Sequence, residues 1–509
     1  MNQPSSAKTI RSVIAASSVG TMIEWYDFYI FGMLAKTIST QFFPEGNATA
    51  ALLSTLAIFA AGFIVRPFGA LVFGRLGDLI GRKYTFLLTL VLMGGSTFLI
   101  GLVPNYKAIG IAAPLLVLFL RLVQGLALGG EYGGAATYVA EHSPAEKRGY
   151  YTSWIQTTAT LGLFVALGVI MLVKLNMSDA SFNAEWGGWR YPFWISILLV
   201  GVSVYIRLKM AESPMFSKLK AEGKVSVNPL KESFRHKVNF KMVLLALFGA
   251  VMGQGVIWYT GQFYAQSFLE NICKIEFEQS RTIMLWAIAL ATPFFLLFGW
   301  LSDKIGRKWI MMLGMLLGIL TYRPIFSTFL KDTDVKEWQK NNQAQASTPI
   351  KYEDAGKGET HITITTPYSL PDGATFKETK SYIEYWNDAK PDTEPTITYK
   401  DKHLASGTYW KFVGLVFLLI LYVTMVYGPI AAFLVEMFPT KIRYTSMSLP
   451  YHIGNGVFGG LVPFIGLLLT TTYPSDPLVG LWYPIGIASL CLVIGTIYLR
   501  NKIDKNVSD

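Results

Sequence analysis

The 509-residue chain has few of the residues that most often build catalytic and metal centres. Its two cysteines, Cys273 and Cys491, lie far apart in the sequence, and its five histidines are scattered. Such spacing supplies neither a disulfide framework nor a set of metal ligands, so we expect no metal and no cofactor. The chain also lacks a nucleophile elbow and a phosphate-binding loop. These absences argue against an enzyme.

Charge is scarce as well, and apolar sequence takes its place. Charged residues make up 15% and hydrophobic residues 52% of the chain, with a mean hydropathy of +0.39. This composition is too apolar for an ordinary soluble protein of this length. Apolar runs of spanning length fall near 12–43, 51–74, 84–103, 109–141, 149–173, 191–208, 241–269, 282–301, 309–330, 407–438, 445–472 and 478–499. We therefore predict an all-α polytopic membrane protein with twelve transmembrane helices in two six-helix pseudo-symmetric bundles.

Polar sequence marks the boundary between the two groups of helices. A basic linker at 209–240 separates an N-terminal bundle, 1–208, from a C-terminal bundle, 241–509. If the N-terminus is cytoplasmic, the short loops on that side hold ten basic residues and those on the other side hold five. An excess of Lys and Arg marks the cytoplasmic side, so we expect both termini there. The protein is then a multi-pass monomer of a bacterial-type cytoplasmic (inner) membrane, and its net charge of +11 requires no nucleic-acid partner.

Two short motifs of the first half recur in the second half. GRLGDLIGRK at 74–83 returns as GWLSDKIGRK at 299–308, an offset of 225 residues. The pattern E-x-x-P-x-x-x-R, first at 141–148, returns at 436–443, an offset of 295 residues. The second half has therefore gained about 70 residues between its two motifs. The polar stretch at 331–405 accounts for this insertion.

The insertion, 331–405, falls between the ninth and tenth predicted helices, and we expect it on the extracytoplasmic side. Alternating segments such as HITITT at 361–366 and TITYK at 396–400 suggest short strands in a small cap. A disordered loop is the alternative, because the segment is rich in Lys, Asp, Glu, Thr and Pro.

The repeated loops carry charged residues at fixed spacing. In each copy an aspartate, Asp78 or Asp303, can accept from backbone N–H groups at a helix start while it pairs with Arg82 or Arg307. Ordinary juxtamembrane charge explains one such loop, but it does not explain two copies at equivalent places. The predicted gating loops comprise Asp78, Arg82, Asp303, Arg307, Glu141, Arg148, Glu436 and Arg443.

These loops resemble the signature of the major facilitator superfamily, which implies two six-helix bundles, a central site and alternating access. A narrower resemblance is to the metabolite:proton symporter family within it. Its residues are GTMIEWYDFYIFG at 20–32, FIVRPFGALVFGRLGDLIGRK, RLVQGLALGGEYGGAATYVAEHSPAEKRG, WGGWRYPF, AESPMF and, in the second half, GPIAAFLVEMFPTKIRYT. The resemblance implies proton-driven import of carboxylates, or of zwitterions such as proline and betaine.

Glu24 and Asp27 lie inside the first apolar run, three residues apart and on one helix face. A charged side chain at the centre of a membrane helix costs roughly 2.5–3.5 kcal/mol on insertion scales, so both acids need partners. With a rise of about 1.5 Å per residue, Asp27 is level with Arg121, and Glu24 is level with Glu131 and Arg66. We expect the charges to pair within these two layers.

The fourth helix carries partner charges on one face. Arg121, Gln124, Leu128 and Glu131 fall within an arc of roughly 80°, so this face looks into a cavity. An acid paired with an intramembrane arginine can alternate between an ion pair and the protonated state, as proton coupling requires. Resemblance to sugar porters implies this role for Asp27 and Arg121. We assign proton coupling to Asp27, Arg121, Glu24 and Glu131. A fixed ion-pair network is the alternative.

Polar and aromatic residues on the spans are candidates for a substrate site, although packing is the simpler role for each one alone. The substrate-binding set comprises Arg66, Arg121, Gln124, Trp154, Gln156, Gln254, Trp258, Tyr259 and Asn455. The two arginines offer donor forks suited to a carboxylate. If the acids neutralise both arginines, then Trp154, Trp258 and Tyr259 suit a quaternary ammonium instead.

We therefore expect a secondary active transporter that imports a small-molecule metabolite with protons by alternating access. The coupling acid must be protonated for part of the cycle, so a small organic acid is the first expectation for the substrate. A zwitterion such as proline or betaine is the second. Export is a further alternative, although the fifth helix lacks the Gly-Pro pair of drug:proton antiporters, and so is a transporter-like sensor.

Overall fold

A computed structural model describes residues 18, 21–23, 25–80, 82–130, 136, 139–140, 143–209, 237–341, 344–355, 359–385, 393–438 and 443–501. Within these ranges, the description excludes the side chains of 74–75, 77–80, 82–86, 206–207, 209, 341, 354–355 and 443–445. The chain forms two compact units. Unit one comprises Met1–Tyr264, Ile288–Tyr322 and Leu419–Asp509, and unit two comprises Ala265–Ala287 and Arg323–Leu418.

Long apolar helices dominate the part of the chain that the structure describes. Eight helices there have the length and composition to cross a membrane: Ala48–Phe73, Ala145–Leu175, Lys237–Asn271, Phe277–Ile305, Arg307–Asp332, Ser406–Met437, Ser446–Thr472 and Val479–Tyr498. Shorter apolar helices at Leu87–Ile100 and Ala112–Leu128 occupy two more predicted runs. Helix α11 (Tyr191–Lys209) occupies another. The run at 12–43 is described in part and ends in α2 (Ala35–Phe42).

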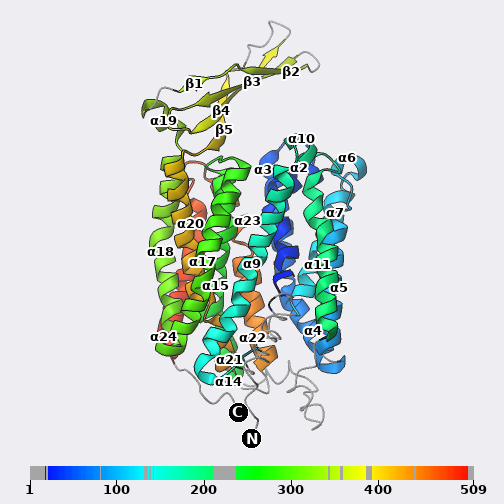
Figure 1. The fold of residues 1–509 in the computed structure, drawn as a ribbon, viewed down its shortest axis with the longest axis vertical. Coiled ribbons are helices and arrows are strands. Elements are labelled where there is room, and N and C mark those ends of the chain that lie inside the picture. Colours follow the sequence, from blue (N-terminus) through cyan, green and yellow to red (C-terminus); the bar gives the residue numbers. More distant parts are fainter. Residues whose placement is uncertain are drawn as a thin grey trace. The chain divides into compact units, whose positions relative to one another are not determined.

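The helices that precede the predicted linker pack backbone against backbone. They are α3 (Ala48–Ile64), α4 (Arg66–Ile80), α5 (Arg82–Ile100), α6 (Tyr106–Ile109), α7 (Ala112–Leu128), η1 (Ala145–Lys147), α9 (Arg148–Leu175), α10 (Asp179–Asn183), η2 (Gly188–Arg190) and α11. Helix α5 packs against both α7 and α11 (Figure 1). A Cβ added at Gly125 or Gly129 of this region would collide with the carbonyl groups of Gly62 and Arg66. Small residues therefore let α7 lie directly on α3 and α4.

The helices after the linker contain three π-helical stretches. The elements are α14 (Lys237–Ala246), η3 (Leu247–Val251), α15 (Met252–Tyr259), η4 (Thr260–Tyr264), α17 (Phe277–Ile305), α18 (Arg307–Asp332), α20 (Ser406–Tyr427), α21 (Ile430–Met437), α22 (Arg443–His452), η5 (Ile453–Gly459), α23 (Val462–Thr472), η6 (Val479–Leu481) and α24 (Trp482–Tyr498). The π-helical η3 and η4 flank α15, and η5 follows α22. Such stretches occur often at functional sites.

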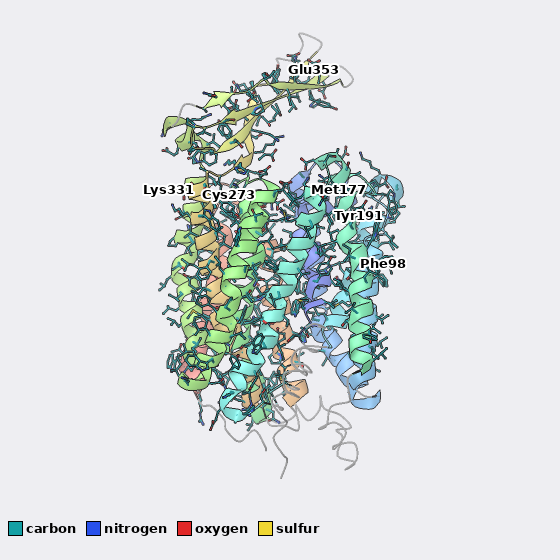
Figure 2. All side chains as sticks on the ribbon, in the orientation of Figure 1. Phe98, Met177, Tyr191, Cys273, Lys331 and Glu353 are labelled. Atoms are coloured by element: carbon teal, nitrogen blue, oxygen red, sulfur yellow. The ribbon has the colours of Figure 1, made fainter. Side chains whose placement is uncertain are left out.

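Unit two contains an antiparallel sheet, the short helices α16 (Ala265–Asn271) and α19 (Val335–Asn341), and the adjoining parts of α17, α18 and α20. Its strands are β1 (Gln345–Ala346), β2 (Ile350–Ala355), β3 (Glu359–Ser369), β4 (Thr375–Tyr385) and β5 (Thr396–His403). They lie in the order β1-β3-β4-β5, and β2, which carries the Glu353 labelled in Figure 2, also pairs with β3. Of the two alternatives for 331–405, the described residues form strands. Leu370 and Phe376 are buried in the core beside the sheet.

The end of β5 is bonded to the helical part of unit two. The Glu276 amide donates to the carbonyl of Lys402 at 2.9 Å. The Gln279 side chain accepts from the Leu404 amide at 2.7 Å and donates to its carbonyl at 3.1 Å. The Lys402 Nζ donates to the Thr333 carbonyl at 2.6 Å. One strand therefore fixes the start of α17 and the end of α18 to the same sheet.

Both cysteines are free and buried. Cys273, labelled in Figure 2, lies in the turn between α16 and α17. Burial raises the pKa of its thiol to about 12, so it stays neutral and unreactive at physiological pH. The described residues also contain no group of three acids, histidines or cysteines placed to hold a metal ion.

Candidate transport site

The predicted coupling pair, Asp27 and Arg121, is not an ion pair in this conformation. Nη1 of Arg121 donates to Oε1 of Gln124, and its Nη2 donates to the carbonyl of Phe59 at 3.3 Å. Neither carboxyl oxygen of Asp27 has a hydrogen-bond partner among the described residues. The expectation of a direct pair is therefore wrong here. Equal depth does not set side-chain direction, and Gln124 is an acceptor one turn away from Arg121.

The carboxyl group of Asp27 faces α5, and its backbone is held by α7. A Cβ added at Gly94 would lie 3.2 Å from Oδ2 of Asp27, whose side chain is fully buried. Nε2 of Gln124 donates to the Asp27 carbonyl at 3.0 Å and to Oγ1 of Thr97 at 2.7 Å. Burying an ionised carboxylate without a partner is costly, so this geometry suits the neutral acid.

Two buried guanidinium groups lie over the ring of Phe28. Cζ of Arg66 is 4.5 Å from its centroid and Cζ of Arg121 is 4.2 Å from it. Arg66 also lies 4.1 Å from the Phe63 ring, and Arg121 lies 4.6 Å from the Phe31 ring. Nε and Nη2 of Arg66 and Nε of Arg121 have no hydrogen-bond partner among the described residues. Aromatic faces stabilise both cations and leave these donors unused.

Aromatic side chains join the two halves of the chain within unit one. Trp25 stacks on Tyr29 with ring centroids 5.1 Å apart, and Trp258 lies 6.0 Å and 5.6 Å from them. Phe63 meets Tyr259 edge to face at 4.9 Å. We call these five residues, together with Phe28 and Arg66, the central cluster. The cluster combines the first helix, α3 and the start of α4 with α15.

Several polar atoms in and around the central cluster lack partners among the described residues. They are the hydroxyls of Tyr29 and Tyr259, Nε1 of Trp258, the side-chain amide of Gln262 and both ring nitrogens of His452. The Arg66 guanidinium interacts electrostatically with Tyr29, Tyr259 and His452. Buried polar groups are nearly always hydrogen-bonded in folded proteins. Orphan donors and acceptors around one cation therefore make the central cluster the candidate site for a polar ligand.

Other predicted substrate contacts lie elsewhere. Gln254 and Asn455 bind each other through reciprocal amide hydrogen bonds of 3.1 and 3.0 Å, which is a packing arrangement. Trp154 is 38% exposed, and its ring contacts Tyr150 edge-on at 6.3 Å. It lies on a helix face away from the buried Gln156, and its grouping with the seventh-helix aromatics stays a prediction.

The second copy of the repeated loop makes the contacts that its spacing predicts. Oδ1 of Asp303 accepts from the amide of Gly149 at 2.8 Å, and its Oδ2 accepts from that of Tyr150 at 2.8 Å. Asp303 also pairs with Arg307 at 2.6 Å. These amides are at the start of α9, so the carboxylate lies at the positive end of that helix dipole. The predicted contacts of Asp303 are confirmed, and its role in gating stays a prediction.

The second E-x-x-P-x-x-x-R motif completes this arrangement. Glu436 accepts from Nη2 of Arg307 at 2.8 Å and from Nη1 of Arg148 at 3.1 Å, and all three side chains are buried. We call Asp303, Arg307, Glu436 and Arg148, with the two bound amides, the Asp303 cluster. Its two acids and two arginines balance in charge. It fastens the start of α9, from the first half of the chain, to the ends of α17 and α21.

The remaining predicted site residues lie outside the described part of the chain. Three are absent from the description altogether: Glu24, Glu131 and Glu141. Three others fall within helices whose side chains are not described there: Asp78, Arg82 and Arg443. The first copy of the repeated loop and the predicted Glu24 layer are therefore still predictions.

Comparison with known proteins decides the family. The inner membrane metabolite transport protein YhjE of Escherichia coli is 32% identical over 91% of this chain and 88% of its own. The chain belongs to the major facilitator superfamily. Within it, the chain is a member of the metabolite:proton symporter family, as its motifs suggested. The family model for "Sugar (and other) transporter" matches residues 13–227.

Other relatives of this transporter differ in the substrate that their names give. The E. coli alpha-ketoglutarate permease is 30% identical over 91% of this chain and 88% of its own. The E. coli proline/betaine transporter is 33% identical over 62% of this chain and 64% of its own. The E. coli xylose transporter XylE, in a partially occluded inward open conformation, matches 97% of this chain and 99% of its own with a TM-score of 0.63 at 16% identity. It shows that the fold is shared, with twelve helices in two bundles.

Aromatic members of the transport site were missed from the sequence. Trp25, Phe28 and Tyr29 lie within GTMIEWYDFYIFG, in which only the two acids had a predicted role. Their spacing of three and four residues places them on one helix face, roughly opposite Asp27. This pattern was the available signal. It also explains why Asp27 points away from the central cluster.

For this transporter we expect Asp303→Asn to weaken closure at the Asp303 cluster. An amide loses the ion pair with Arg307 and leaves a buried arginine less compensated, a change that costs up to about 3–5 kcal/mol when a buried partner is removed. Cysteine pairs at the ends of α9 and α17 should cross-link less in the variant. Unchanged cross-linking would show that the cluster does not hold this end closed. Asp78→Asn applies the same test to the first copy.

Proposed function

We propose that the protein imports a small organic acid together with protons by alternating access. The observation that carries this proposal is the pair of buried guanidiniums, Arg66 and Arg121, with unused N–H donors. Neither forms an ion pair with a carboxylate of the described residues. A guanidinium presents a planar fork that matches a carboxylate in two hydrogen bonds. The central cluster therefore supplies what an anionic substrate needs.

The same geometry argues against a simple cation as substrate. Arg66 lies over Trp25 at 5.4 Å as well as over Phe28 and Phe63, so these ring faces already hold a cation of the protein. A second cation beside Arg66 would meet charge repulsion in a site of low dielectric. An anion instead gains from both arginines and from the neighbouring hydroxyl donors.

Proton coupling is assigned to Asp27 in this proposal. Its carboxyl is buried and has no partner among the described residues, which suits the neutral form. Gln124 binds both Arg121 and the Asp27 carbonyl, so Arg121 is near enough to pair with Asp27 in another state. Exchange between these arrangements lets the acid take up and release one proton per cycle.

The topology follows from the charge pattern of the loops. We place both termini in the cytoplasm, and with them the Asp303 cluster, so that this cluster closes the inner side. The N-terminal bundle is 1–208, the linker 209–240 and the C-terminal bundle 241–509, with the insertion 331–405 outside. We propose a monomer, and the inner-membrane location agrees with the name of YhjE. The name of the alpha-ketoglutarate permease supports an organic acid as the substrate.

A zwitterion such as proline or betaine is the second candidate. The rings of Tyr29 and Trp258, with centroids 5.6 Å apart, would supply the aromatic contacts of a quaternary or secondary ammonium, while Arg66 binds the carboxylate. The proline/betaine transporter named above is a relative over part of the chain. This alternative shares the arginine but adds a cation site.

Binding and counterflow in proteoliposomes test the choice. A panel of mono- and dicarboxylates should bind wild type, and Arg66→Gln and Arg121→Gln should each weaken binding by about 10-fold or more, since a charge-assisted hydrogen bond contributes roughly 1.5–3 kcal/mol. Lys107→Gln is the matched control, because it removes one positive charge from a side chain that is 76% exposed. Tight betaine binding that survives Arg121→Gln, with no carboxylate binding in either protein, would make the zwitterion the substrate.

A further inference from the structure

Gln124 uses every polar atom of its side chain inside the protein. Its Oε1 accepts from Arg121, and its Nε2 donates to the Asp27 carbonyl at 3.0 Å and to Thr97 Oγ1 at 2.7 Å. All four residues are buried, with Gln124 at 0% exposure. A primary amide offers one acceptor oxygen and two N–H donors. Gln124 therefore has no free donor for a substrate, and its predicted place among the substrate contacts is not supported by this geometry.

The amide occupies the position that a carboxylate partner of Arg121 would take. Its Nε2 is bonded to the first helix at Asp27 and to α5 at Thr97, and its Oε1 binds the guanidinium of Arg121. Gln124 contacts Asp27 only through its backbone. The Asp27 carboxyl faces Gly94 and has no partner in the part of the chain that the structure describes. A neutral group thus gives the cation an acceptor, while the acid has no partner among the described residues.

We propose that Gln124 is a positioning residue for proton coupling: it holds Arg121 off the Asp27 carboxyl in this conformation, and Arg121 must exchange Gln124 for Asp27 when the proton is released. The inference rests on the proposed proton symport and names the group that separates the two charges. The step moves one proton from the Asp27 carboxyl to water, and the resulting carboxylate pairs with Arg121. No covalent bond other than O–H is broken.

The charged and titratable surroundings agree with this role. Among the described residues, the groups that act on Asp27 or Arg121 are Tyr26, Arg66 and Tyr259. The hydroxyl of Tyr26 donates to the Pro192 carbonyl at 2.8 Å, away from the carboxyl of Asp27. Arg66 is a second cation near Arg121, and its repulsion favours a state in which Arg121 has an acceptor. In this conformation that acceptor is the Gln124 amide.

Two substitutions at Gln124 separate this role from simple packing. Gln124→Leu frees Arg121 to pair with Asp27, which favours the ionised carboxyl, so the pH of half-maximal uptake should fall by about one unit or more. Gln124→Glu gives Arg121 a permanent carboxylate partner of the same size. This variant should lose uphill accumulation while it retains counterflow.

The measurements are pH profiles of uphill uptake and of counterflow in proteoliposomes. The control is Gln266→Leu, which makes the same substitution at a glutamine that does not bind Arg121. Gln266 is a buried glutamine of α16 that donates to Ser280 at 3.1 Å, and its loss should leave the pH midpoint unchanged. In an Asp27→Asn background, where only counterflow is measurable, Gln124→Leu should not shift the pH profile of counterflow, because the titrating group is gone.

Two failures are distinguishable in these data. A wild type without proton-driven accumulation would overturn the proposed symport and this inference with it. The inference alone would be overturned by three results together. Wild type accumulates substrate, Gln124→Leu has the same pH midpoint as wild type, and Gln124→Glu has the same uphill uptake as wild type. Lower uptake in Gln124→Leu with an unmoved midpoint would also count against it, because that is the result of a purely structural role.

Discussion

Asp27→Asn is expected to abolish uphill accumulation of substrate and to leave energy-independent exchange measurable. The Asp27 carboxyl is buried and has no partner among the described residues, so an amide of the same size fits the site but binds no exchangeable proton. The variant is therefore fixed in a form that mimics the protonated acid. It can reorient with substrate but cannot complete the return that depends on proton release.

The measurement compares concentrative uptake under an imposed pH gradient with counterflow at equal pH on both sides. Asp401→Asn is a suitable control, because this half-exposed residue has a φ of 49°, where asparagine is well tolerated. We expect the control to accumulate substrate normally. Accumulation at the wild-type level in Asp27→Asn would remove Asp27 from the coupling mechanism and direct attention to the other intramembrane acids.

The parts of the molecule that the sequence predicted well depend on local patterns. Apolar runs set the bounds of the spans to within a few residues, as α11 (Tyr191–Lys209) shows against the predicted 191–208. The contacts of Asp303 followed from the spacing of an aspartate and an arginine four residues apart near a helix end. Such features require only the geometry of one helix and its terminus.

The parts of the molecule that the sequence predicted poorly depend on how the helices are rotated about their axes. Asp27 and Arg121 were predicted to share one rough layer of the membrane, yet one faces Gly94 and the other turns to Gln124. Trp154 is correctly placed on a span but on its more exposed face. A rotation of a helix moves a side chain to another neighbour without changing any property of the sequence. The aromatic faces that receive both arginines belong to this class.

The insertion shows a different limit. Alternation in HITITT and TITYK indicated strands, but not the 11-residue lengths of β3 and β4. Nor did it indicate that Gln279, at the start of α17, would bind both backbone groups of Leu404. These bonds join segments more than 120 residues apart, and only the folded chain brings them together.

The second large effect on transport is expected at the Asp303 cluster, which is proposed above to close the inner side. Gly149→Ala should prevent the start of α9 from docking on the end of α17. An added Cβ would lie 2.6 Å from the Gly299 carbonyl oxygen and 2.6 Å from Oγ of Ser302, and real Cβ atoms do not approach so closely. A backbone carbonyl cannot rotate aside as a side chain can. The Asp303 cluster must then open by displacement of a whole helix end.

Gly168→Ala is the matched control on the same helix, because nothing lies within 4 Å of its added Cβ. That substitution should be neutral or should stabilise α9 by up to about 1 kcal/mol, the difference in helix propensity between alanine and glycine. Distances measured between spin labels at the ends of α9 and α17 should lengthen in Gly149→Ala and stay unchanged in Gly168→Ala. Uptake should fall by about 10-fold or more only in the first, which corresponds to roughly 1.4 kcal/mol against the closed state. Equal distances and equal uptake in both variants would show that the close approach at Gly149 is not part of the transport cycle.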